Sequence, residues 1–333
     1  MKVHNSPYSG QLIWKERNTY VPLLFEARDL WRQLEAEVDR ELLTLNGGLT
    51  IGDPDTDVMK SLLKSIDEFK LDHEILRGNE AAERFPQHRL FPEDIMVLDK
   101  NAGFLRRELA VVSAVERAEA LGAAIKRYTT VQGVYPDKES VTIVANEKEY
   151  RVNKVLVTTG AWTGKLLPRL RDQLTARRLV LTKFAPKNAE EYKPEKFPIF
   201  ARMRKGYRLT GTPTFDGTMV KASNTKNPEA PDKLNRDVSS EELQEVGEAV
   251  DQLLPGLVPN PVRASVYMDA YTEDDHSIVG RLPGMDITFL TSGFSGYGFK
   301  MSPVIGKIAA DLITEGEIRH SIGHLDPYRY AKA

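Results

Sequence analysis

Asp286-Ile-Thr-Phe-Leu-Thr-Ser292 and the segment after it, Gly293-Phe-Ser-Gly-Tyr-Gly298, decide the fold of this chain. The first is rich in the β-branched and aromatic residues that are typical of a strand, and the second contains three glycines. Apolar residues then recur at helical spacing from Met301 to Thr314, and Gly316 ends this pattern as a helix C-terminal glycine does. A strand, a glycine loop and a helix in this order are typical of a ligand site in α/β proteins.

A second apolar strand supports an α/β core. Val155-Leu-Val-Thr-Thr159 is almost wholly apolar and runs directly into Gly160-Ala-Trp162. Such a strand is expected inside a parallel sheet, and the carboxyl edge of such a sheet is where α/β proteins bind ligands. The hydrophobic pattern also predicts helices at 20–37, 58–69, 107–121 and 239–254, and strands at 47–52, 124–134, 140–145 and 154–159.

The middle third of the chain has a different character. Prolines and glycines are spread through residues 186–261, between alternating segments such as 206–211 and 217–222. Alternation bounded by turn residues predicts antiparallel strands. We therefore expect an antiparallel substrate domain that is inserted into a nucleotide-binding domain.

Composition limits the classes of function. The 333 residues include 46 Lys and Arg against 48 Asp and Glu, and no cysteine. The length favours two core-forming domains, and the net charge of −2 favours small molecules over nucleic acid as partners. No disulfide or thiolate site can form, and no segment resembles a signal core or a membrane span, so we predict a soluble, cytoplasmic protein. The basic clusters at 169–178 and 202–205 are expected to be solvated faces, and Asp274-Asp275-His276 a solvated turn rather than a metal site.

The loop at 293–298 has the properties of a cofactor site. Its glycines permit positive φ angles and let backbone amides approach a ligand closely. A helix N-terminus adds unpaired amides and partial positive charge, which suit an electron-rich group such as the ring of a reduced flavin. Glycines between a strand and a helix also form simple tight turns, so the loop alone leaves both interpretations open.

The wider sequence resembles a known enzyme family. Thr291-Ser-Gly-Phe-Ser-Gly-Tyr-Gly-Phe-Lys300 closely resembles the loop of monomeric sarcosine oxidase and N-methyltryptophan oxidase, which have a histidine in place of Tyr297. Similar segments follow the family order over nearly the whole chain, among them Tyr20-Val-Pro-Leu23, Gly160-Ala-Trp162 and Asp275-His276. The chain is thereby identified as a member of the FAD-dependent amine oxidoreductases, which are D-amino-acid-oxidase-like. This resemblance implies oxidation of a secondary amine or N-substituted amino acid by hydride transfer to flavin, followed by reoxidation with oxygen to give hydrogen peroxide.

The resemblance also implies a domain plan. It predicts a mixed α/β fold, with a discontinuous Rossmann-like FAD-binding domain at 1–46, 107–175 and 276–333 and an inserted antiparallel-sheet substrate domain at 47–106 and 176–275. Matching positions predict the residues that contact the cofactor, which are Val131, Gly160, Trp162, Gly293, Phe294, Ser295, Gly296, Tyr297, Gly298 and Lys300.

Three residues match catalytic positions of the family. Pro213-Thr-Phe-Asp-Gly-Thr-Met-Val-Lys221 resembles the strand whose lysine lies at the flavin edge and promotes electron transfer to oxygen. A fixed cation there would stabilise the negative charge that develops on oxygen. Lys300 resembles the lysine that helps to hold the substrate carboxylate, and His4 resembles the flavin-facing histidine. The alternatives are a solvated strand lysine, a helix-start lysine without a ligand and a surface histidine.

Other positions depart from the family. Gln11 stands where sarcosine oxidase has an arginine for the substrate carboxylate, and Tyr8 stands where it has an arginine over the flavin. Asp269 replaces an aromatic residue of the substrate pocket. Tyr267 occupies the position of the cysteine that holds FAD covalently, so FAD is predicted to be non-covalent there. Gln11, Tyr267, Asp269 and Lys300 are the predicted substrate residues, and a specificity other than sarcosine is expected.

One family motif is absent. Members begin with a strand, a G-x-G-x-x-G turn and a helix that hold the FAD pyrophosphate, and this sequence contains no G-x-G-x-x-G. A shortened gene model, a partner chain that supplies the unit, and a relic without flavin are the three explanations. The alternative to an oxidase is therefore an inactive remnant or one subunit of a heteromeric flavin dehydrogenase.

Overall fold

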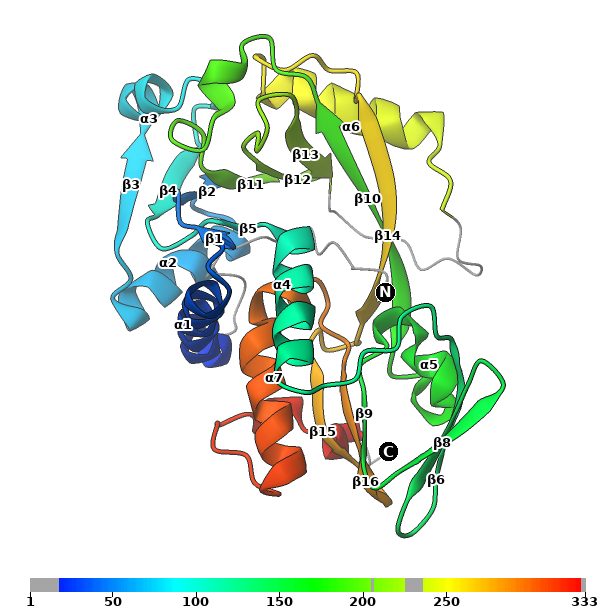
Figure 1. Ribbon diagram of the computed structural model, residues 1–333. Coiled ribbons are helices and arrows are strands. Elements are labelled where there is room, and N and C mark those ends of the chain that lie inside the picture. The colour runs from blue at the N-terminus through cyan, green and yellow to red at the C-terminus, as the bar shows by residue number, and fades with distance from the viewer. Residues whose placement is uncertain (1–17, 205–206, 225–235, 331–333) are drawn as a thin grey trace.

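The largest element of the computed structural model is an eight-stranded sheet in the upper half of Figure 1. The structure describes residues 18–204, 207–224 and 236–330. All neighbouring strands are antiparallel except β11 and β2, which are parallel. In spatial order the strands are β14 (Arg263–Tyr271), β10 (Thr175–Phe184), β13 (Val220–Asn224), β12 (Tyr207–Thr212), β11 (Ile199–Arg204), β2 (Gly48–Gly52), β4 (Ile95–Asp99) and β3 (His73–Arg77).

Helix α6 (Ser240–Leu253) covers one face of this sheet. The Ser239 hydroxyl accepts a hydrogen bond from the Glu242 amide, and the Glu242 carboxylate accepts one from the Ser239 amide. This capping box satisfies two amides that would otherwise lack partners. The helix buries Val246, Val250 and Leu253 in a cluster that includes Phe184, Leu209 and Val220 of the sheet.

The lower half of the molecule contains a smaller sheet and three packed helices. β9 (Val155–Val157) pairs in parallel with β16 (Met285–Ser292), and β15 (Ile278–Leu282) pairs antiparallel with β16. Helices α1 (Val21–Val38) and α7 (Gly298–Thr314) lie side by side, and α4 (Arg107–Ala120) contacts α1 (Figure 1). The α1–α7 contact is an apolar cluster that includes Leu23, Leu24, Ala27, Met301, Val304 and Ile308.

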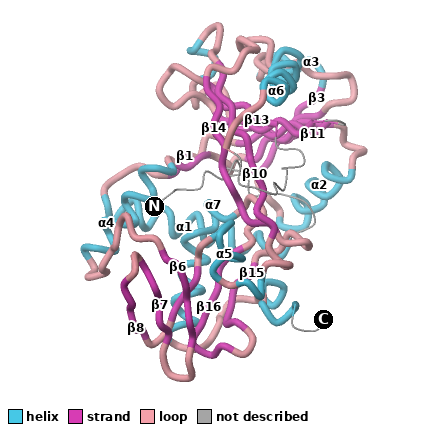
Figure 2. Tube along the Cα trace, turned by 90° about the vertical axis from the view of Figure 1, so that its right-hand side faces the viewer, coloured by secondary structure: helices cyan, strands magenta, loops and turns pink. Residues whose placement is uncertain are grey.

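Figure 2 shows a third sheet beside β16, with strands β6 (Val131–Pro136), β7 (Val141–Ala145) and β8 (Lys148–Val152). The strand predicted at 124–134 is wrong in its first half, because no strand precedes Val131 there. Arg127 makes two hydrogen bonds of 2.9 Å to Glu119 of α4, and Tyr128 has a φ of 55°. Positive φ at Tyr128 is incompatible with an extended strand.

The mixed α/β class is confirmed, and α1, α2 (Asp57–Phe69), α4 and α6 confirm the four predicted helices. Among the described residues the parallel strand pairs are β9–β16 and β2–β11. α7 begins at Gly298, earlier than the predicted Met301, so Lys300 lies inside the helix. The remaining short strands and α-helices of the described residues are β1 (Leu43–Thr44), β5 (Phe104–Leu105), α3 (Gly78–Arg84) and α5 (Thr163–Leu166).

The predicted solvation of the basic clusters is wrong for two arginines. Arg202 is 1% exposed and its guanidinium lies 2.5 Å from a carboxylate oxygen of Asp94. Arg178 is also buried and pairs with Glu242 at the start of α6. Each arginine is compensated by an acid that is distant in sequence, which a local charge pattern does not reveal.

Within the described ranges, every helix is too short or too polar to span a bilayer.

Candidate functional site

The loop between β16 and α7 adopts the conformations that its glycines permit. Gly293 has a φ of 68° and Gly296 a φ of 93°, with Ser295 between them at 48°. A Cβ atom on Gly293 would lie 2.6 Å from Thr272 Cγ2 and 2.9 Å from Leu174 Cδ2. Both the backbone conformation and the close packing therefore require glycine at position 293.

Hydrogen bonds fix this loop on the end of β14. The Gly296 amide donates to Asp269 Oδ2 at 2.8 Å, and the Ser295 amide donates to the Ala270 carbonyl at 2.9 Å. The Thr272 amide donates to the Ser295 hydroxyl at 3.3 Å. Because these loop amides bond within the protein, the amides that a ligand could reach are in the rest of the loop and in the first turn of α7.

Asp269 is the carboxyl group that supports the loop. Its Oδ1 atom accepts from the Ala270 amide at 2.8 Å, while Oδ2 accepts from Gly296. Desolvation raises the pKa of Asp269 to about 6, although both hydrogen bonds favour the charged form. The structure therefore brings the predicted substrate residue Asp269 directly against the predicted cofactor loop.

Lys300 is a buried cation in the first turn of α7, with 6% of its surface exposed. Its Nζ atom lies 5.4 Å from the centroid of the Tyr297 ring, and its carbonyl accepts from the Trp31 indole at 3.0 Å. Burial, and then the charge of Arg208, lowers the pKa of Lys300 to about 7. An incoming carboxylate would favour the ammonium form of this side chain.

Lys221 is a second buried lysine, on β13 directly opposite Lys183 of β10. Burial lowers its pKa well below the usual range, and the charges of Arg107 and Lys183 lower it further. Arg107 and Lys183 are not among the sites predicted from the sequence. One feature of the sequence could have identified Arg107. The pair Arg106-Arg107 is at the start of a helix, where positive charges are unfavourable because they oppose the helix dipole.

The turn after β9 lies beside the glycine loop, as expected for two parallel strands that end at one edge. Gly160 has a φ of 52° and opens the turn Gly160–Trp162. The Ser292 hydroxyl lies 3.0 Å from the Thr163 hydroxyl and donates to the Gly160 carbonyl at 3.4 Å. The predicted cofactor residues of both segments are therefore neighbours.

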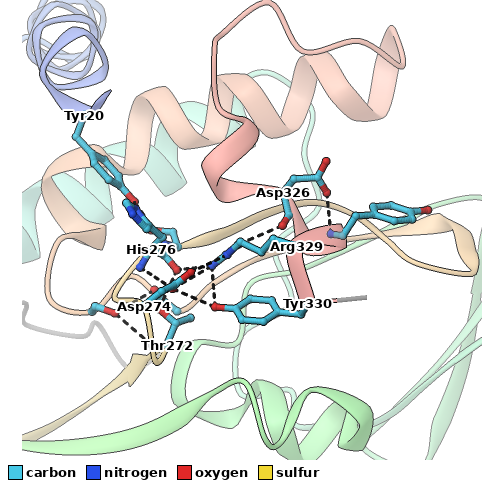
Figure 3. A network of polar contacts seen from close by, with 11 residues as sticks. Tyr20, Thr272, Asp274, His276, Asp326, Arg329 and Tyr330 are labelled. Carbon is cyan, nitrogen blue, oxygen red and sulfur yellow. Dashed lines mark hydrogen bonds and ion pairs between the residues drawn. The ribbon is translucent and has the colours of Figure 1, made fainter. Parts of the chain in front are cut away.

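A polar network connects the start of α1 to the C-terminal segment beside the site (Figure 3). The Tyr20 hydroxyl lies 3.1 Å from His276 Nδ1, and the Arg329 guanidinium donates to the His276 carbonyl at 2.7 Å. Arg329 also pairs with Asp274 at 2.9 Å. Burial opposes ionisation of Asp274, but the bond to Arg329 and the amide of His276 hold its pKa at about 2. Asp274 is thus an ion-pair partner in this network.

The other residues predicted for the site lie in different parts of the chain. Tyr267 is on β14 two residues before Asp269, so both side chains point to the same face of the strand. Val131 opens β6 opposite Ala145, and its contact with the cofactor stays a prediction. His4 and Gln11 lie outside the described residues.

Comparison with known sequences matches most of this chain to one family. The family model for FAD dependent oxidoreductases matches residues 4–312. Monomeric sarcosine oxidase of Streptomyces avermitilis is 30% identical, over 99% of this chain and 90% of the relative. N-methyl-L-tryptophan oxidase of Salmonella dublin is 28% identical, over 89% of this chain and 80% of the relative.

Solved structures share the fold. NikD, an amino acid oxidase essential for nikkomycin biosynthesis, superposes with a TM-score of 0.85 and 20% identity, over 97% of this chain and 88% of NikD. L-proline dehydrogenase from P. horikoshii also gives a TM-score of 0.85, at 19% identity, over 98% of this chain and 87% of that enzyme. The match to the family model extends from residue 4 into α7, and the chain belongs to the family of FAD dependent oxidoreductases.

Proposed function

We propose that this chain oxidises a secondary amine or an N-substituted amino acid, as the names of its sarcosine oxidase and N-methyl-L-tryptophan oxidase relatives suggest. The observation that carries the proposal is the position of Lys300. This buried lysine immediately follows the loop Gly293–Gly298 and has a pKa of about 7. It supplies a cation for a substrate carboxylate beside the loop that would hold the cofactor.

The residues present fit the ring end of FAD. Glycine at positions 293 and 296 leaves the loop without side chains there, and Tyr297 makes no side-chain cap to the first amides of α7. Gly160, Trp162 and the loop would hold the cofactor between them, because the two segments are neighbours. FAD, when bound, supplies the two-electron acceptor that converts an amine to an imine and passes the electrons to oxygen as hydrogen peroxide.

The two buried lysines have separate proposed roles. Lys300 binds and orients the substrate carboxylate, and that negative charge restores the ammonium form. Lys221 provides a cation for the negative charge that develops on oxygen, and that negative charge in turn favours the ammonium form that burial and the neighbouring cations disfavour. Desolvation strengthens both electrostatic effects.

Tyr267 bears on how the cofactor is held. A phenol does not form the thioether that a cysteine forms at this position of the family, so we propose that FAD is non-covalent there. Acid precipitation of the flavin-loaded protein should leave the flavin in the supernatant. Flavin that stays with the precipitated polypeptide would contradict this proposal.

The function is tested by hydrogen peroxide formation after FAD is added to the purified chain. N-methyl amino acids, cyclic imino acids and fructosyl amino acids form the substrate panel. Amine-dependent peroxide supports the oxidase, whereas no peroxide with any member contradicts it for this chain. That a partner chain supplies the site for the FAD pyrophosphate stays a prediction. Isolation of a flavin-containing complex of this chain with a second polypeptide would support it.

A further inference from the structure

A cavity of about 300 Å³ lies between the start of α4 and strands β10, β12 and β13. We call it the basic cavity because Arg107, Lys183 and Lys221 all line it. Leu105, Phe215 and Met219 contribute apolar surface to its wall. The volume is at the lower end of the range of small-molecule sites.

The three cations come from different elements and converge on this one space. Lys183 and Lys221 are opposite each other in the β10–β13 ladder, so their side chains share a face of the sheet. Arg107 begins α4 and reaches the same cavity. Like charges that are directly opposite in a ladder are destabilising, so this arrangement is unfavourable without a compensating negative group.

Within the described part of the chain, the side chains of Arg107 and Lys183 make no hydrogen bond or ion pair. The neighbouring Arg106 differs, because it donates to the Thr44 hydroxyl at 2.7 Å and lies 3.2 Å from Glu41. Glu108 also lines the cavity, but its side chain is exposed to solvent. Asp216 acts on Lys183, and Glu108 on Arg107, through electrostatics without a hydrogen bond, so both cations keep hydrogen-bond donors for a ligand.

Electrostatics favour an anionic ligand. Desolvation lowers the pKa of Arg107, and the nearby carboxylate of Glu108 offsets only part of this effect. Lys221 is affected more strongly, since burial and both neighbouring cations lower its pKa. An anion in the cavity would stabilise all three positive charges at once.

We propose that the basic cavity binds the carboxylate or phosphate group of a small anionic ligand through Arg107 and Lys183, beside Lys221. The guanidinium of Arg107 can donate two parallel hydrogen bonds to either group, and Lys183 adds a point charge. The apolar wall accommodates the organic part of the ligand. Because Lys221 also lines this cavity, the proposal rests on the proposed function where the anionic group belongs to the amine substrate, and stands independently of it where the ligand is a free anion.

Inorganic phosphate is the probe for the first test, titrated calorimetrically into the full chain at constant ionic strength. The parent should bind phosphate, and its Tm should rise with phosphate concentration. Arg107→Gln/Lys183→Gln should weaken the affinity at least about tenfold, because two charge-assisted contacts are lost. The charge-preserving variant Arg107→Lys/Lys183→Arg should retain binding, and its Tm without phosphate checks folding.

A matched control removes one arginine charge and one lysine charge outside the basic cavity. Arg89 and Lys165 are exposed and outside the cavity, so Arg89→Gln/Lys165→Gln should bind phosphate like the parent. Equal affinity of the parent and Arg107→Gln/Lys183→Gln would overturn the proposal, as would no binding by the parent.

The source of the anionic group is tested with N-methyl-aspartate and N-methyl-asparagine. If the acid belongs to the substrate, the parent should prefer the aspartate derivative in kcat/KM, and Arg107→Gln/Lys183→Gln should lose that preference. If the ligand is a free anion, the preference should be the same in both proteins while phosphate binding is lost. Should neither amine be oxidised, the proposed function fails, and the phosphate titration still decides the anion site.

Discussion

Lys221 and Lys300 are both buried, but their surroundings differ. Lys221 faces the cations Arg107 and Lys183, whereas Lys300 packs near the ring of Tyr297 at the glycine loop. A cation near the reacting oxygen and a cation near the substrate affect different half-reactions. Substitution of each lysine therefore has a distinct kinetic signature.

Lys221→Met is expected to slow the reaction with oxygen by about a hundredfold or more, because a preorganised cation is removed from a desolvated site. Reduction by substrate should change much less. Stopped-flow measurement of the two half-reactions checks this, with the exposed Lys307→Met as control. Equal slowing of both half-reactions by Lys221→Met would refute the assigned role.

Asp269 gives a pH-dependent prediction. Its pKa rises from 3.8 to about 6 on folding, so the folded chain binds this proton more tightly than the unfolded chain. Stability therefore falls as pH rises from about 4 to about 6, by about 3 kcal/mol at most. Asp269→Asn cannot ionise, so the free energy of unfolding of the variant minus that of the parent should increase across this interval.

Urea unfolding at several pH values measures this difference. Asp286→Asn is the matched control, since Asp286 is exposed on β16 and makes no hydrogen bond to the loop. A difference that stays constant with pH for Asp269→Asn would show that Asp269 does not titrate as described.

At the scale of elements, alanine substitution of two glycines in the strand–loop–helix unit is expected to change the stability of the fold in opposite directions. Gly293→Ala places a Cβ at a φ of 68° and within 2.6 Å of Thr272, so it should destabilise the fold by about 1–3 kcal/mol. Gly306 is exposed in the interior of α7 and a Cβ there meets nothing within 4 Å. Gly306→Ala should stabilise the fold by about 0.5–1 kcal/mol, because alanine loses less conformational entropy in a helix. Thermal unfolding of both variants measures these two changes in stability. A lower Tm for Gly306→Ala than for the parent would contradict the second prediction.

Local patterns predicted most elements but not their ends. Helical spacing of apolar residues predicted α1 and α6, and β-branched and aromatic residues predicted β16. The start of α7 was placed too late, because Gly298 resembles a loop residue and Pro303 is typical of a first helical turn. In the structure, α7 begins at Gly298 and contains Pro303, so Lys300 lies in its first turn, where it is buried.

At the scale of the whole molecule, the sequence could not predict which side chains meet through long-range pairing. The glycine loop and Lys221 were predicted because short motifs carry them. Arg107 and Lys183 join Lys221 only when β10 pairs with β13 and α4 packs nearby. The burial of Arg202 likewise depends on Asp94, 108 residues away. The division into a FAD-binding and a substrate domain stays a prediction at this scale.

The central claim is that this chain takes electrons from an N-substituted amino acid through bound FAD. The most direct test is an anaerobic titration of the FAD-loaded chain with the substrate panel, followed through the visible flavin band. We predict that at least one N-methyl or cyclic imino acid bleaches the band, and that air restores it with formation of hydrogen peroxide. A band that no amine bleaches, on a protein that demonstrably holds FAD, would contradict the account.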